Sequence, residues 1–514
     1  MNLINDEWIP IRRKSGLKEK IAPWQITDKY AEDPIIELAA VRPDFNGALI
    51  QFLIGILQTT CAPRGSGDWR KWLNDPPSPN EFKGKFETVA DAFNLDGGGP
   101  RFMQDLTIEN DEHKIWNISK LFPGFPGVET ENDNTDLFIK SNSLNNLCIH
   151  CSATAIFMAQ SYARSGGAGW RQGLRGSNPV TSIIKGDSLW KTSWLNVIGR
   201  DQFLALGNIG KDEKADKFPW IEKTKTSEND EQVFMTDVHP SQIFWQIPWR
   251  IRIIIKQKQD FCDVCGESSE ESCGEFLAKN YGVNYKGGWK HPLTPYSCKV
   301  DEPQNIKPVT ISAGGVGYRH WMGLVLPSDK AQPSLVVQEF FNRMHESAIE
   351  KIPLWVFGYD MKKDKARCWY ESVMPVVFIE DEQKWKVYCA DMAMLIRAAE
   401  AVSNSVSKAV VKALNVGVFN AVRKRFWQET ESEFYKQIEV LRQTVLGGPD
   451  TVSVRQTWHA YLVKKAFEIF NDMSQADMIE LVDAKRVARA QNELWENLDG
   501  KKSEKLKVEI LGLP

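Results

Sequence analysis

Two Cys-x-x-Cys pairs constrain the fold of this chain more than any other sequence feature. One pair is Cys148 and Cys151, and the other is Cys262 and Cys265. A Cys-x-x-Cys turn presents two thiolates to one point, and two such turns complete a tetrahedral zinc site with Zn–S distances of about 2.3 Å. Because 110 residues separate the pairs, a shared zinc ion would join distant segments. The spacing predicts one zinc site with these four ligands.

A local zinc site and a cluster without metal are the alternatives. The local site would use Cys262, Cys265, Cys273 and Cys298, with His291 nearby. In the other alternative, the thiols of one or both pairs are simply buried. The chain has nine cysteines, and an odd number in a large chain expected to be cytosolic argues against a disulfide framework. Four protein ligands would close the coordination sphere and make the zinc structural, whereas catalytic zinc keeps a position open for water.

The pattern of apolar residues changes near residue 385. Before it, short β-branched or aromatic runs such as Val309–Ser312 alternate with Gly- and Pro-rich breaks, which is typical of strands and turns. After it, apolar residues recur every three or four positions in four stripes, which indicates amphipathic helices. The fourth stripe, from Leu481 through Ala484, Ala488 and Gln491 to Leu494, is the weakest. We expect an α+β protein, with a large mixed α/β domain at residues 1–384 and a four-helix bundle at 385–514.

Two segments suggest contacts with nucleic acid. Ser165–Gly176 contains five glycines, whose bare backbone can approach a phosphate or a groove, and its Arg171 and Arg175 add positive charge. It lacks the spacing and the terminal Lys-Ser/Thr of a nucleotide P-loop. Gly358–Arg367, hereafter the basic turn, carries four cations and two acids, a net charge of +2. The alternatives are a flexible connecting loop for the first segment and a solvated turn for the second.

The sequence gives little support for an enzyme or a membrane protein. It contains no Gly-x-Ser-x-Gly, His-Glu-x-x-His or kinase motif, so we expect no catalytic activity. The net charge of −3 is not the basic balance of a protein that grips duplex DNA alone, so any DNA contacts would be local. No apolar run reaches the ~18 residues of a membrane helix. The acidic first residues argue against a signal peptide, so the expected location is the cytoplasm.

Several short segments occur in a characteristic order along the chain. They are Met1–Ile4 with Trp8–Pro10, Arg101–Gln104, the first Cys-x-x-Cys pair, Gly173–Gly176 with Pro179–Thr181, the second pair, and Trp289 with His291–Pro292. Through these segments and its helical tail, the chain resembles the CasA family over essentially its whole length. The members of that family are the large subunits of type I-E CRISPR Cascade complexes.

The resemblance implies a non-catalytic subunit that lies near the 5′ handle of the guide RNA. It further implies that the chain recognises the protospacer-adjacent motif in foreign double-stranded DNA, helps to start unwinding, and recruits the nuclease-helicase. The implied partners are the other Cascade subunits, the guide RNA, the target DNA and the nuclease-helicase. In RNA-guided complexes generally, base pairing with the guide reads the target sequence while the protein reads only the short flanking motif.

The resemblance also assigns residues to DNA contacts. The family's glycine loop falls on Ser165–Gly169 and would approach the minor groove, with Ala168 where the family has glycine. We expect bulky residues at Gly167 and Gly169 to leave the fold intact and to block this approach. The family's motif-contacting lysine falls on Lys279 or Asn280, and its charge favours Lys279.

Two further family elements complete the predicted DNA contacts. The strand-separating wedge falls within Met361–Ala366, where this chain has about three additional residues and lacks the family's glutamine. The aromatic residue of the loop near the guide handle aligns with Phe138. The predicted DNA-contacting residues are therefore Phe138, Gly166, Gly167, Ala168, Gly169, Lys279, Lys362, Lys363 and Lys365.

Two other classes of function remain open. A zinc-dependent enzyme that processes nucleic acid would need an open coordination position and a nearby acid or base. A scaffold held together by zinc would bind only protein.

Overall fold

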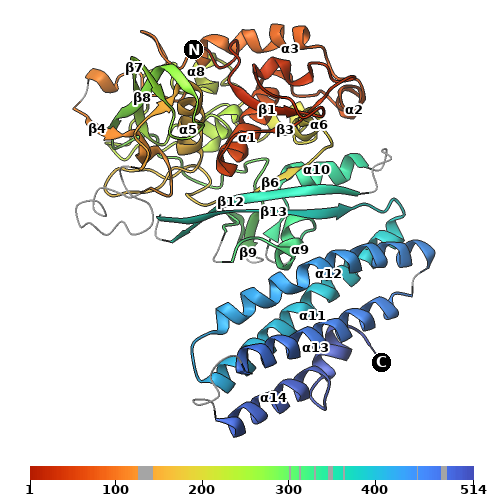
Figure 1. Cartoon of the computed structure of the whole chain (residues 1–514). Coiled ribbons are helices and arrows are strands. Elements are labelled where there is room, and N and C mark those ends of the chain that lie inside the picture. The colour runs from red at the N-terminus through yellow and green to blue at the C-terminus, as the bar shows by residue number, and fades with distance from the viewer. Residues whose placement is uncertain are drawn as a thin grey trace. The chain divides into compact units, whose positions relative to one another are not determined.

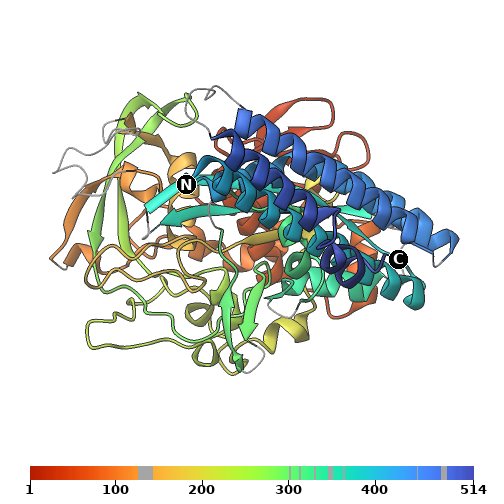
Figure 2. The same cartoon turned by 90° about the horizontal axis from the view of Figure 1, so that it is seen from below.

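The protein is described by a computed structural model that contains both sheets and helices, which confirms the α+β prediction. The described residues are 1–110, 112–125, 143–299, 302–311, 314–328, 331–344, 351–362, 365–448, 450–475 and 483–513. Figures 1 and 2 show the strands gathered in the first three quarters of the chain and the long helices at its C-terminal end. Among the described helices, none combines the length and apolar character needed to cross a membrane.

Backbone contacts divide the chain into two compact units. The first contains residues 1–313, 329–343 and 354–371, and the second contains residues 314–328, 344–353 and 372–514. The division of the chain into a mixed domain at 1–384 and a helical bundle at 385–514 stays a prediction.

The core of the first unit surrounds a helix that is apolar on nearly all sides. This helix, α1 (Pro43–Cys61), begins with a proline at its first position, where the missing N–H breaks no helical hydrogen bond. Nearly every residue from Phe45 to Gln58 is buried, as expected for a helix without a polar face. Phe52 packs against the rings of five other aromatic residues at centroid distances of 5.3–6.0 Å, namely Trp8, Phe93, Phe102, Phe157 and Trp245.

A four-stranded sheet positions the first cysteine pair beside the second. Its longest strands, β7 (Arg250–Phe261) and β8 (Ser268–Lys279), form an antiparallel hairpin in which Arg250 is opposite Lys279 and Phe261 is opposite Ser268. On its other side, β8 pairs with β4 (Lys114–Asn117) and β5 (Leu147–Cys148). The second cysteine pair therefore lies in the hairpin turn, and the first pair lies where β5 ends.

Three smaller sheets and several short helices complete the fold. The sheets have the strand orders β2-β1-β3, β10-β9-β11 and β13-β12-β6. Their strands are β1 (Ile9–Arg13), β2 (Lys18–Ile21), β3 (Ile35–Leu38), β6 (Thr181–Ile184), β9 (Tyr296–Lys299), β10 (Glu302–Pro308), β11 (Ala331–Gln332), β12 (Lys351–Lys362) and β13 (Lys365–Val377). The shorter helices are α2 (Ser66–Asn74), α3 (Pro79–Phe86), α5 (Ile149–Ser161), α6 (Leu189–Trp194), α7 (Arg200–Leu204), α8 (Lys214–Lys217), α9 (Trp321–Leu324) and α10 (Leu335–Met344).

Four long helices dominate the second unit. They are α11 (Glu382–Leu414), α12 (Phe419–Gly447), α13 (Val452–Gln475) and α14 (Ala484–Leu498), and α11 packs against the other three. The carboxylate of Asp381 caps α11 by accepting two backbone N–H groups, and Asn415 ends the helix in the left-handed region at a φ of 57°.

The first three predicted apolar stripes are buried, but the predicted face of α14 is wrong. Ala484, Ala488 and Gln491 are exposed, and the buried residues are Ala490, Leu494 and Leu498. Alanines occur on both faces of this helix, so the helical spacing through Leu494 fits either set equally well. Only packing against a neighbour selects the face.

Candidate metal centre and nucleic-acid interface

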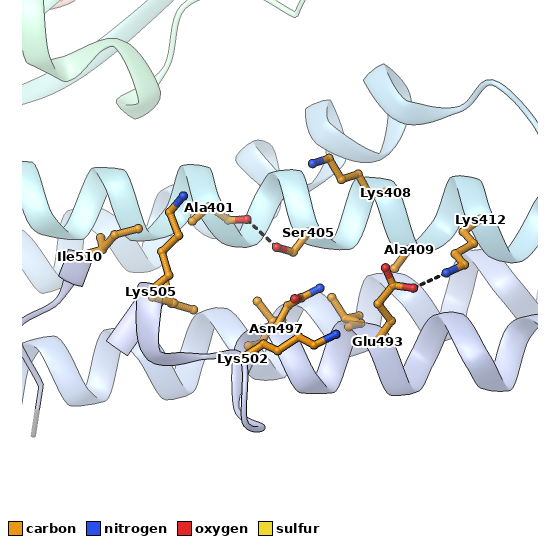
Figure 3. Close-up of a pocket in the computed structure, with 13 residues that line it drawn as sticks. Ala401, Ser405, Lys408, Ala409, Lys412, Glu493, Asn497, Lys502, Lys505 and Ile510 are labelled. Carbon is orange, nitrogen blue, oxygen red and sulfur yellow. Dashed lines mark hydrogen bonds and ion pairs between the residues drawn. The ribbon is translucent and has the colours of Figure 1, made fainter. Parts of the chain in front are cut away.

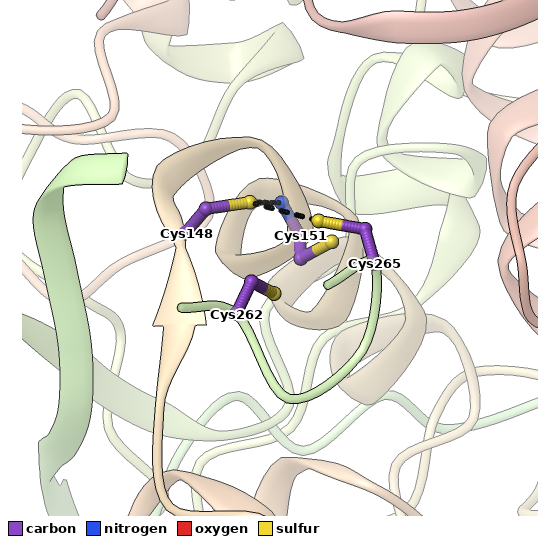
Figure 4. Close-up of side chains that lie close together, drawn as sticks. All are labelled: Cys148, Cys151, Cys262 and Cys265. Carbon is purple, nitrogen blue, oxygen red and sulfur yellow. Dashed lines mark hydrogen bonds between the residues drawn. The ribbon is translucent and has the colours of Figure 1, made fainter. Parts of the chain in front are cut away.

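The four cysteines of the two Cys-x-x-Cys pairs converge on one point. Their Sγ atoms all lie within 4.8 Å of one another, and Figure 4 shows them directed toward a common centre. Cys148 is the N-cap of α5, and its Sγ accepts the backbone N–H of Cys151 at 3.4 Å. Gly266, at a φ of +76°, allows the hairpin turn to close by donating its N–H to the carbonyl of Cys262 at 2.8 Å.

A carboxylate beside the cysteine cluster joins the two segments that carry it. Asp263 accepts the backbone N–H groups of Asn145 and Asn146 at 2.7 and 2.8 Å, and its own N–H donates to the carbonyl of Asn146 at 2.9 Å. The hairpin turn is thereby held against the strand that leads to Cys148. The sequence did not reveal this role of Asp263, although its position inside the second Cys-x-x-Cys pair was a signal.

The protonation of the cluster is uneven. Hydrogen bonds from Cys148 and Cys151 lower the pKa of Cys262, and a hydrogen bond from Cys151 lowers the pKa of Cys265 to about 7. Hydrogen bonding to the other thiols and burial raise the pKa of Cys151. Four soft sulfur ligands at one buried point form a donor set that fits a metal such as zinc. The group could therefore hold a metal ion with four protein ligands.

Cys273, a member of the alternative local quartet, is not part of this cluster. It is buried, and its Sγ donates to the carbonyl of Glu275 at 3.6 Å. The side chain of Cys298 lies outside the part of the chain that the structure describes.

The glycine loop and Lys279 lie side by side. The carbonyl of Ala168 accepts a hydrogen bond from the side chain of Asn280 at 3.1 Å, and the carbonyl of Gly169 accepts the N–H of Tyr281 at 2.7 Å. Both donors directly follow Lys279 at the end of β8. Gly166, Gly167 and Ala168 are exposed. Two predicted DNA-contacting segments, about 110 residues apart in the sequence, therefore form one surface.

The two positive-φ glycines of the loop have different surroundings. A Cβ atom at Gly167, where φ is +117°, would have no atom within 4 Å. A Cβ atom at Gly169, where φ is +79°, would lie 2.9 Å from ring atoms of Tyr281. Bulky residues are unfavourable at both glycines because a side chain at a positive φ strains the backbone. At Gly169 a larger residue would also displace the Tyr281 ring that holds the loop.

Stacked tryptophans anchor the loop to the sheet. The rings of Trp170 and Trp116 are nearly parallel, with centroids 4.7 Å apart, and Trp170 packs edge-on against Trp249 at 5.5 Å. Trp116 lies on β4 and Trp249 directly precedes β7. Both strands pair with β8, whose last residue is Lys279. These contacts could not be predicted from the sequence, because nothing in the spacing of the three tryptophans connects them.

Of the two arginines of the loop, Arg175 does not add positive charge at the surface as predicted. Arg175 is fully buried and donates to the hydroxyls of Thr181 and Thr294 and to the amide oxygen of Gln51. Burial lowers its pKa. Arg171 is half-buried, and its guanidinium donates to the hydroxyl of Ser227 at 2.8 Å. Arg175 therefore holds the loop in place from within the protein, and Arg171 ties it to Ser227.

The basic turn lies at the end of the β12–β13 hairpin. Lys362 and Lys365 are exposed at the ends of the two strands, and Arg367 pairs with the buried Asp360 at 2.5 Å. Within the described residues, no hydrogen bond or ion pair links either lysine to the glycine loop. Phe138 and Lys363, two other predicted DNA-contacting residues, lie outside the described residues.

A separate cavity of about 280 Å³ lies between α11, α14 and the turn that follows α14. Figure 3 shows its charged side chains, which include Lys408, Lys412, Lys502, Lys505 and Glu493. Glu493 is the one acid among the lining residues, and it pairs with Lys412. The lining residues contain no histidine or cysteine, so the cavity does not assemble a nucleophile with a general base.

Comparison with known proteins connects this fold to one family. Residues 2–469 match the family model of the CRISPR-associated protein Cse1. The structure is similar to that of Thermus thermophilus CasA (Cse1), with 16% identity and a TM-score of 0.70 over 96% of this chain and 99% of that chain. Thermobifida fusca Cse1 matches with 14% identity and a TM-score of 0.71 over 100% and 99%. A chain of a CRISPR RNA-guided surveillance complex matches with 14% identity and a TM-score of 0.65 over 96% and 99%.

Proposed function

Since this chain belongs to the Cse1 (CasA) family of CRISPR-associated proteins, we propose that it is the large, non-catalytic subunit of a type I-E Cascade surveillance complex. In this role it recognises the protospacer-adjacent motif in foreign double-stranded DNA, helps to start unwinding, and recruits the nuclease-helicase. Its partners are the other Cascade subunits, the 5′ handle of the guide RNA and the target DNA. The complex works in the cytoplasm.

One observation supports motif recognition at a defined place. The exposed backbone of Gly166–Ala168 is held beside Lys279, because the carbonyls of Ala168 and Gly169 accept hydrogen bonds from Asn280 and Tyr281. A bare backbone can enter a groove that side chains would block, and a lysine beside it can donate to acceptors on base edges or phosphates. The chain as a whole has a net charge of −3, so it does not bind DNA phosphates strongly over its whole surface. A local site of this kind suits a subunit whose partners supply most of the affinity for nucleic acid.

The basic turn is the proposed wedge. Lys362, Lys363 and Lys365 would attract the phosphates of the separated strands, while the tip of the hairpin fills the opened end of the duplex. Phe138 would contact the motif end or the guide handle. These two assignments rest on the family resemblance.

The cysteine cluster is the proposed zinc site. Zinc bound by Cys148, Cys151, Cys262 and Cys265 would have four protein ligands and would cross-link two segments of the chain. A closed site of this kind leaves no position for an activated water, which argues against a zinc-dependent enzyme. The cluster also lies beside the sheet that carries Lys279, so its role is to support the DNA-reading surface.

Binding by the assembled complex tests the proposal. Cascade is reconstituted with guide RNA, with and without this chain, and its affinity is measured for duplexes that carry either the motif or a scrambled motif. We expect a preference for the motif that requires this chain and falls when Lys279 is changed to Gln. The proposal fails if the complex binds both duplexes equally. It also fails if the chain does not co-purify with the guide-RNA complex.

A further inference from the structure

A carboxylate from another part of the chain lies against the lysine of the proposed motif-reading site. The Glu228 carboxylate is 3.7 Å from the Lys279 ammonium and 3.5 Å from the Arg250 guanidinium. Lys279 and Arg250 are themselves directly opposite each other in the β7–β8 hairpin. Glu228 therefore offsets positive charge at the point where we propose that DNA binds.

The position of Glu228 is fixed by its backbone neighbour. The N–H of Ser227 donates to the carbonyl of Tyr281 at 3.0 Å, and its hydroxyl donates to the carbonyl of Gly282 at 2.8 Å. The same hydroxyl accepts a hydrogen bond from Arg171 of the glycine loop at 2.8 Å. The segment that carries Glu228 is thus tied both to the glycine loop and to the residues that follow Lys279.

We propose that Glu228 is a specificity-determining residue that weakens the binding of DNA phosphates at Lys279. The proposal rests on the proposed function and names a regulator of the same site. A phosphate carries a full negative charge and is repelled by a carboxylate close to its lysine. An acceptor on a base edge is neutral and is repelled much less. Repulsion by Glu228 therefore weakens the binding of DNA phosphates at Lys279 more than the binding of base edges of the motif. This difference in binding free energy favours motif DNA over other DNA.

A purely structural role for Glu228 is the competing explanation. Like charges directly opposite each other on neighbouring strands are unfavourable, and Glu228 could serve only to offset Arg250 and Lys279. Arg250, however, already has a buried partner, because its guanidinium donates to the carboxylate of Asp105 and both side chains are at most 2% exposed. Glu228 is 44% exposed, and ion pairs with so much solvent contribute little to folding.

The test compares Glu228→Gln with a matched variant, Glu231→Gln, in reconstituted Cascade. Glu231 is an exposed acid of the same segment, and within the described residues its carboxylate forms no hydrogen bond or ion pair. Removing Glu228 should tighten binding to a scrambled-motif duplex about three- to fivefold, since an exposed charge contact has an effect of this order. Binding to the motif duplex should tighten by less than about twofold, because the base contact gains less from the lost repulsion. Glu231→Gln should change both affinities by the same small factor.

Two further measurements complete the test. If Glu228→Gln lets Lys279 bind one more phosphate, the affinity for the scrambled duplex should depend more steeply on salt. The slope of the logarithm of the binding constant against the logarithm of the salt concentration should then steepen by up to ~0.9. In a Lys279→Gln background, Glu228→Gln should have no effect. The inference is overturned if Glu228→Gln tightens both duplexes equally, if Glu231→Gln has the same effect, or if the effect persists without Lys279. A wild-type complex that does not prefer the motif overturns the proposed function, and this inference with it.

Discussion

Loss of the proposed zinc ion from the cysteine cluster should destabilise the first unit specifically. The perturbation is Cys262→Ser, together with zinc chelation of the wild-type chain. Cys151 and Cys262 enclose 110 residues, and a cross-link around a loop of about 100 residues stabilises a fold by about 4.7 kcal/mol in the chain-entropy model. Part of this constraint persists without metal, because β5 pairs with β8 and Asp263 bonds to Asn145 and Asn146. We therefore expect a loss of about 3–4 kcal/mol.

Elemental analysis and thermal unfolding provide the assay. The wild-type chain should contain one zinc ion, and the cobalt-substituted protein should show the spectrum of a tetrahedral four-thiolate site. A loss of this size should lower the unfolding temperature of the first unit by about 5–10 °C. The unfolding temperature of a domain of roughly 150–250 residues falls by about 2–4 °C per kcal/mol, and that of a larger unit falls by less. The transition of the helical second unit should not move.

Two other cysteines provide the controls. Cys368 is exposed and Cys273 is buried, and neither belongs to the cluster, so Cys368→Ser and Cys273→Ser should both retain the zinc. A folded, reduced wild-type protein without metal, or with an unfolding temperature insensitive to chelation, would refute the reasoning. Loss of zinc in Cys273→Ser would restore the local quartet instead.

Three further predictions concern the segments proposed to contact DNA. Gly167→Val should strain the loop only through its positive φ and reduce motif-dependent binding at least tenfold, whereas Gly169→Val should lower the unfolding temperature further, because its side chain also overlaps Tyr281; equal unfolding temperatures would contradict this. Arg175→Ala should destabilise the first unit by about 3 kcal/mol, because it leaves a cavity and buried acceptors without a donor. The salt dependence of duplex binding should not change. Alanine at all three lysines of the basic turn should weaken binding to closed duplex more than binding to a pre-opened bubble. In the bubble, the base pairs are already open, so the free energy of about 1.4 kcal/mol per stacked step is not needed. Equal losses on both substrates would make the turn a simple phosphate contact.

Local sequence patterns were sufficient for the features that depend on spacing within one element. Helical periodicity predicted the buried faces of α11, α12 and α13, because packing requires apolar residues on one side of each helix. The two Cys-x-x-Cys pairs predicted four ligands, since a turn with this spacing directs two thiols to one side. The same reasoning failed on α14, where alanines left two faces equally apolar.

Features that depend on which segments become neighbours were decided by the tertiary structure alone. Nothing in the sequence indicated that Arg175 is buried among uncharged acceptors, since arginine is usually exposed. Nor did it indicate that Glu228 lies against Lys279, because the two residues are 51 positions apart and belong to different elements. The pairing of β7 with β8 and the backbone bonds of Ser227 bring these charges together. The sequence by itself predicted the four cysteines, the glycine loop and the lysine of the proposed sites. The fold determined which charges surround them, because electrostatic interactions depend on distances in space and not along the chain.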